Sequence, residues 1–224
     1  MRPLALLSIL LASAFGQTYN VPYAPGTDGS GPTFVNEQVL HWYPGSFSSI
    51  RKVDFRNFRF LSFDKNGKPL GRFSLKNGHY EHAEPLDHSS ADLDSVHYLG
   101  KSPASDGESA LVLFSWFAAG GSSSQGGSAT VFTLSGRRLQ AVQEIGWDKQ
   151  VQTDQPTESF DASTSTLVIR SAHYIPGDAH CCVSAMDVVT FRWDGTRFVQ
   201  AGLQTVLSEY GKNEGKTLPT TLPR

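Results

Sequence analysis

This sequence of 224 residues lacks a large excess of either charge, because its 19 Lys and Arg residues nearly balance its 21 Asp and Glu residues. Without a concentrated basic face, nucleic acid is not an expected partner, and without a polybasic run neither is anionic lipid. The chain also lacks the apolar run of about 20 residues that a membrane-spanning helix needs. No nucleophile elbow, phosphate loop or zinc-protease helix is present. The prediction therefore leans towards a protein that is not an enzyme and holds no cofactor or metal.

The first residues have the pattern of a secretory signal peptide over residues 1–16. Arg2 supplies the positive start, and an apolar stretch follows over residues 4–11. Small residues at Ala14 and Gly16 favour cleavage after Gly16, with cleavage after Ala14 as the alternative. No cysteine follows the apolar stretch to carry a lipid anchor. We therefore expect a secreted or periplasmic protein with no membrane-spanning segment once the signal peptide is removed.

Turn-forming residues divide the rest of the chain. Residues 17–32 are rich in Pro and Gly and indicate a flexible arm. Residues 33–210 are expected to form one β-rich domain, and the polar residues 211–224 a disordered tail. Within the domain, Val35, Val39 and Trp42 recur at helical spacing and predict one short N-terminal helix.

Beyond that helix the hydrophobic period is two, with turn signals every ten to fifteen residues. Asn77-Gly78 and Asp194-Gly195 are the strongest hairpin signals, and residues 120–127 are expected to be a loop. Ser109–Phe117 is apolar on both faces, which predicts a central strand covered on both sides. The fold class is therefore predicted as all-β, with antiparallel sheets arranged as a sandwich, a barrel or a partial propeller.

The four tryptophans are assigned by their surroundings. Trp116, inside the apolar run, is expected in the core, and Trp193 as an anchor between strands. Trp42 and Trp147 remain as candidates for the surface.

Cys181 and Cys182 are the only cysteines, and they are neighbours. A bridge between them closes a small ring, because adjacent Cα atoms lie about 3.8 Å apart and ordinary disulfides need more. One interpretation is a vicinal disulfide that shapes a turn. The alternatives are two free or separately modified thiols, an intermolecular bridge, or a redox or metal role with Asp178 and His180 nearby. Adjacent side chains on an extended chain point to opposite faces, which disfavours a shared metal ion.

Residues 177–184, which include His180-Cys181-Cys182, lead into residues 190–198 with Arg192-Trp193-Asp194-Gly195. Together these segments resemble the C-terminal signature of LppP/LprE-type bacterial lipoproteins and related secreted proteins. Val183 stands where the signature has proline. The resemblance implies an envelope location and a β fold, and it implies no particular activity.

The sequence thus favours a secreted or periplasmic binding or structural module that is not catalytic. Its alternatives are an envelope hydrolase acting on polysaccharide or cell-wall material, and a redox or metal-binding protein that uses the two cysteines. An envelope component or a polysaccharide is the expected partner. The candidate binding or structural site comprises Asp178, His180, Cys181, Cys182, Ser184, Trp193 and Asp194. The hairpin at Asp194-Gly195 is expected to support the cysteine loop, with Trp193 beneath it.

Overall fold

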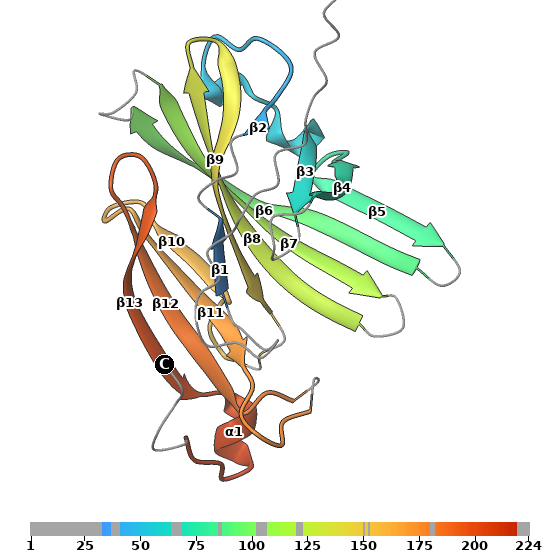
Figure 1. The fold of residues 1–224 in the computed structure, drawn as a ribbon, viewed down its shortest axis with the longest axis vertical. Helices are drawn as coiled ribbons and strands as arrows, with labels where there is room; N and C mark the ends of the chain where they lie inside the picture. The colour runs from blue at the N-terminus through green and yellow to red at the C-terminus, as the bar shows by residue number, and fades with distance from the viewer. Residues whose placement is uncertain are drawn as a thin grey trace, which may run out of the picture.

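A computed structural model describes residues 33–36, 41–63, 69–84, 87–101, 107–119, 123–149, 151, 153–179 and 182–218. Most of this part of the chain forms antiparallel strands, which confirms the all-β prediction (Figure 1). The predicted signal peptide and flexible arm lie outside it. None of its helices is long and apolar enough to cross a bilayer.

The largest sheet has seven strands, in the order β1-β9-β8-β7-β6-β5, and β2 also pairs with β9. The strands are β1 (Thr33–Asn36), β2 (His41–Trp42), β5 (His79–Glu84), β6 (Asp87–Lys101), β7 (Glu108–Ala119), β8 (Ser123–Ser135) and β9 (Arg138–Asp148). From β5 to β9 each strand lies beside the next in sequence, so these strands form a meander. Figure 1 shows that this sheet is strongly curved.

Two smaller sheets cover the opposite faces of the large one (Figure 1). The four-stranded sheet has the order β10-β11-β12-β13, and β3 pairs with β4 in the two-stranded sheet. Their bounds are β3 (Arg59–Phe63), β4 (Pro69–Ser74), β10 (Glu158–Asp161), β11 (Thr166–His173), β12 (Ala185–Trp193) and β13 (Phe198–Leu207). Two 3-10 turns, η1 (Ile50–Lys52) and η2 (Phe55–Asn57), lie on the same side as β3 and β4.

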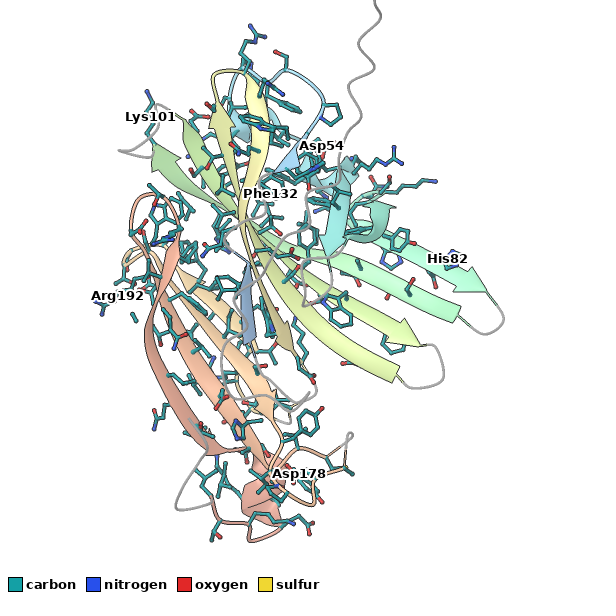
Figure 2. All side chains as sticks on the ribbon, in the orientation of Figure 1. Asp54, His82, Lys101, Phe132, Asp178 and Arg192 are labelled. Atoms are coloured by element: carbon teal, nitrogen blue, oxygen red, sulfur yellow. The ribbon has the colours of Figure 1, made fainter. Side chains whose placement is uncertain are left out.

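Strand β7 is the shared centre of two hydrophobic cores. Its residues Leu111 and Leu113 pack with the four-stranded sheet, including Phe191. The alternate residues, among them Val112, pack on the other face with an aromatic cluster around Phe132 (Figure 2). The predicted two-sided burial is therefore confirmed for residues 109–114, whereas residues 115–117 are only partly covered. Each such leucine contributes about 2 kcal/mol to folding through burial.

The predicted N-terminal helix is wrong. Residues 33–36 and 41–42 are strands β1 and β2, which pair with β9, while residues 37–40 lie outside the described part. Pairing with a neighbouring strand satisfies backbone groups that a short isolated helix leaves open, and tertiary context here overrides a weak helical pattern. The α-helix of the described part is instead α1 (Glu209–Asn213), and three of its residues fall within the predicted disordered tail.

Two tryptophan predictions are also wrong. Trp116 is 40% exposed and Trp147 is 3% exposed, whereas Trp42 is 41% exposed as expected. Gly126 and Gly127 explain the exchange, because their missing side chains leave room for Trp116 on one face of the sheet and Trp147 on the other. Both glycines belong to β8, so residues 123–127 are strand rather than loop.

The turn predictions hold in part. Asp194-Gly195 joins β12 to β13 as predicted. Asn77 and Gly78 both have positive φ, 57° and 91°, as a two-residue turn requires. Past this turn, however, β4 and β5 enter different sheets, so the predicted hairpin does not continue.

Candidate functional site

The candidate site is the segment between β11 and β12, at one end of the four-stranded sheet. Pro176 and Gly177 form the corner of a β-turn, in which the Asp178 amide donates to the Ile175 carbonyl at 3.0 Å. Gly177 has a φ of 93°, which glycine adopts without strain at this position. Further along the chain, the Cys182 amide donates to the Ala179 carbonyl at 2.9 Å in an isolated antiparallel bridge.

The Asp178 carboxylate ties the two ends of this segment together. One oxygen, Oδ2, accepts from the amides of Ile175 at 3.0 Å and Ser184 at 2.9 Å. The other, Oδ1, accepts from the Ser184 hydroxyl at 2.5 Å. Both carboxylate oxygens are thus occupied by donors of the protein itself, and residues 175–184 form a closed loop, which we call the Asp178 loop.

Hydrogen bonds attach the start of helix α1 to the Asp178 loop. The Ser208 amide donates to the Ser184 carbonyl at 3.0 Å, and the Ser208 hydroxyl donates to the Val183 carbonyl at 2.5 Å. That hydroxyl also accepts from the Gly211 amide and so caps the helix. A Cβ on Gly211 would lie 2.0 Å from the Ser184 carbonyl oxygen, so only glycine allows this approach. Ser184 and Ser208 are fully buried.

Beside the loop, sequence reasoning missed a buried carboxylate. His173 Nδ1 lies 3.0 Å from Asp187 Oδ2, and the Thr205 hydroxyl donates to Asp187 Oδ1 at 2.5 Å. The hydrogen bond to Asp187 raises the pKa of His173 above its usual value. An aspartate inside the otherwise apolar start of β12 was the available signal, because a buried charge needs a partner.

The cysteine pair is only partly visible. Cys182 is half-buried, and the described part of the chain holds no free cysteine thiol. His180 and Cys181 lie outside the described residues. Within the residues that the structure describes, no group of three or more His, Cys, Asp or Glu side chains is placed to hold one metal ion.

Trp193 and Asp194 do not join this site. They lie at the other end of β12, whose length of about 27 Å separates them from the Asp178 loop. Figure 2 shows Arg192, the neighbour of Trp193, well apart from Asp178. Trp193 packs on Phe198 with ring centres 5.3 Å apart, so it does not lie beneath the loop. The expected support of the loop by this hairpin is therefore wrong, because a straight strand of nine residues keeps its ends apart.

A second polar cluster connects the large sheet with strand β10 of the four-stranded sheet. Lys149 Nζ donates to Glu158 at 2.7 Å and to the Ser115 hydroxyl at 2.6 Å, and it lies 3.7 Å from Asp94. The Ser115 hydroxyl donates in turn to Asp94 at 2.6 Å. A shallow, open depression of about 200 Å³ lies beside this cluster and is lined by Ser90, Asp92, Ser115, Trp116, Phe117, Gln125 and Lys149. Burial raises the pKa of Asp94 above its usual value.

Part of the chain is similar to a known protein family. Residues 142–196 match the LppP/LprE lipoprotein family, which confirms the resemblance predicted from the sequence. The matched segment runs from β9 to the turn after β12 and contains the whole Asp178 loop. The lipoprotein description suggests an envelope-associated protein. No curated protein and no solved structure matches the chain significantly.

Proposed function

We propose, from the similarity of residues 142–196 to LppP/LprE lipoproteins, that this chain is a non-catalytic binding or structural module of the cell envelope. In this proposal the chain is exported by a signal peptide cleaved after Gly16 and works outside the cytoplasm. The Asp178 loop is the surface that it presents to an envelope partner.

The observation that carries the proposal is the full engagement of the Asp178 carboxylate. A carboxylate that acts as a general acid, base or nucleophile must reach its substrate with an oxygen, within hydrogen-bonding distance. Asp178 instead accepts three hydrogen bonds from Ile175 and Ser184. The nearby Asp187 is likewise shared between His173 and Thr205. These carboxylates fix the shape of a loop, which suits binding by a preorganised surface.

We further propose that Cys181 and Cys182 form a vicinal disulfide at the outer part of the loop. The absence of a free thiol at the described Cys182 supports this pairing, since Cys181 is the one other cysteine of the chain. The Cys182 amide also donates to the Ala179 carbonyl, which keeps these two residues close together. With Asp178 closing its base and a disulfide at its outer part, the loop has little conformational freedom to lose on binding.

The proposal is tested by binding of the purified protein to an isolated cell-envelope fraction. Asp178→Ala should weaken binding at least tenfold, because the loop loses its shape. Asp194→Ala is the matched control, since Asp194 also accepts two backbone amides, at Thr196 and Arg197, but at the far end of β12. Equal binding by both variants would contradict the proposal. Sugar release from the envelope fraction that is lost in Asp178→Ala would also contradict the proposal, because it would show that Asp178 takes part in catalysis.

Hydrolysis of envelope polysaccharide is the second candidate, and the depression beside Lys149 is the observation that favours it. Glycosidases use two carboxyl groups on either side of the scissile bond. Asp94 and Glu158 flank Lys149 here, and Asp94 has a raised pKa. Both carboxylates, however, are held by Lys149 or Ser115, which leaves the depression better suited to weak binding than to proton transfer. Sugar release that is abolished by Glu158→Gln would establish this alternative.

A redox or metal role, the third alternative, depends on His180 and Cys181, which lie outside the described residues. It stays a prediction. Bound metal measured in the purified protein, and its loss in Cys182→Ser, would favour it over the structural role of the cysteines.

A further inference from the structure

Three separate segments of the chain bring basic side chains together at one end of the large sheet. Arg51 and Lys52 come from η1, Lys101 from the end of β6, Arg137 from the turn between β8 and β9, and Arg138 from the start of β9. All five are exposed. In the sequence they are spread over almost ninety positions, so no basic run marks them. We call this group of five residues the basic tip.

The sheet register places these residues in one region. Lys101 pairs with Glu108, and Glu108 pairs with Leu134. The next residue, Ser135, pairs with Arg138 across the turn that contains Arg137. Glu108 also accepts from the Ile50 amide at 2.8 Å, which attaches η1 to the same corner.

Glu108 offsets only part of the positive charge of the basic tip. Its Oε2 accepts from the Ser49 hydroxyl at 2.6 Å as well as from the Ile50 amide. The Ser49 and Ile50 hydrogen bonds, with the nearby charges of Arg51 and Lys101, lower the pKa of Glu108 below its usual value. Asp54, between η1 and η2, is the other described acid at this end, so five cations face two carboxylates.

Two half-exposed aromatic rings stand beside the cations. Arg51 lies over the Tyr98 ring, 4.4 Å from its centre, and Arg138 lies over the Trp42 ring at 4.5 Å. Tyr98 is 37% exposed and Trp42 is 41% exposed. Tyrosine and tryptophan are enriched where membranes meet water, because their rings sit among headgroups, and each basic residue close to an anionic bilayer adds to the attraction.

We propose that the basic tip docks on a membrane surface that carries anionic phospholipid headgroups. The cations lie on strand ends and turns at the end of the sheet where the β8–β9 hairpin projects (Figure 1). A projecting end meets a flat surface more readily than it encloses a polymer chain. Figure 2 shows Lys101 and Asp54 towards one end of the molecule and Asp178 at the other. A protein docked through its basic tip therefore points the Asp178 loop away from the bilayer. The proposal is independent of what the loop binds.

Vesicle sedimentation tests the location of the docking surface. The chain should sediment with vesicles of phosphatidylglycerol and phosphatidylcholine, should not sediment with phosphatidylcholine alone, and should be released by high salt. The triple variant Arg51→Gln, Arg137→Gln, Arg138→Gln should bind the anionic vesicles about a hundredfold more weakly, since each charge contributes about fivefold. All variants keep the same N-terminal segment, so a difference between them cannot arise there.

A matched variant removes three exposed cations elsewhere, Lys76→Gln, Arg192→Gln, Lys216→Gln, and keeps the same net charge as the first variant. It should retain binding. Equal loss in both triple variants would overturn the proposal, because net charge alone would then explain the attraction. Binding of soluble polyphosphate without binding to anionic vesicles would also overturn it, since the partner would then be a free polymer.

Fluorescence quenching by lipids with brominated acyl chains provides a second readout. Trp42 and Trp116 have nearly the same exposed fraction, 41% and 40%, but Trp116 lies in the part of β7 remote from the basic tip. Trp42→Phe should abolish the quenching that anionic vesicles cause, and Trp116→Phe should leave it. The reverse pattern would place a different face of the protein on the membrane.

Discussion

Replacement of Asp178 by alanine should destabilise the whole domain. Ser184 is fully buried, so its amide and hydroxyl cannot be rehydrated once the carboxylate is gone. Each buried donor left without a partner costs about 1–3 kcal/mol, and the half-buried Ile175 amide costs less. The sum gives a loss of about 3 kcal/mol in the free energy of unfolding. For a domain of this size that corresponds to a decrease in Tm of about 6–12 °C.

The assay is urea unfolding followed by tryptophan fluorescence, with hydrogen exchange of the Ser184 amide as a local readout. Asp194→Ala serves as the control, because the amides that Asp194 accepts are on exposed residues and water can replace the carboxylate. The control should lose less than about 1 kcal/mol. If Asp178→Ala loses no more than the control, the reasoning from buried donors is refuted.

Three further predictions concern packing and pH. Gly211→Ala should lower the free energy of unfolding by at least about 2 kcal/mol, because the new Cβ would lie 2.0 Å from the Ser184 carbonyl oxygen. Gly202→Ala is the control and should lower it by less than about 1 kcal/mol, because its Cβ would make only an ordinary 3.8 Å contact with the Thr190 side chain. Burial raises the pKa of Glu144 to about 8, so the folded state loses stability as pH rises from about 4.5 through 8. Glu144→Gln should match the unmodified protein near pH 4 and exceed it by roughly 4 kcal/mol at pH 9; equal stability at both pH values would contradict a buried carboxyl. The raised pKa of His173 also makes the protein less stable as pH rises. The stabilisation from protonated His173 beside Asp187 is complete below pH 6.5 and is lost as pH rises through the pKa of His173 in the folded state. His173→Gln should therefore lose less than about 1 kcal/mol at pH 5.5 and nothing at pH 9, and a loss that is the same at both would exclude the ionic contribution.

The general architecture could be predicted from local pattern. The alternation of apolar residues and the turn residues Asp194-Gly195 indicate antiparallel strands, and the structure has them. The two-faced apolar stretch at β7 predicts a central position, because such a strand must be covered twice. The strands, the turn and the central position of β7 each depend on residues that are neighbours in the sequence, so a local pattern is enough to predict them.

What could not be predicted depends on contacts between distant segments. The helical spacing of Val35 and Trp42 was misleading because β9 offered both segments a partner strand. Trp116 and Trp147 exchanged their expected positions because two glycines on the neighbouring strand β8 decide where a large ring fits.

The candidate site shows the same limit. Asp178 and Ser184 are close in sequence, and the loop they close could be proposed from composition. Its support by Ser208 and Gly211 could not, because those residues return from the end of β13 more than twenty positions later. The basic tip could not be predicted from the sequence for the same reason, since its cations come from three separate segments of the chain.

The most direct test of the account is the intact mass of the exported protein, alkylated with and without prior reduction. The account predicts a polypeptide that begins at Gln17, forms no disulfide-linked dimer, and takes up alkylating reagent at Cys181 and Cys182 only after reduction. Alkylation of both cysteines without reduction, or a mass that retains the first sixteen residues, would contradict an exported module whose binding loop is closed by a vicinal disulfide.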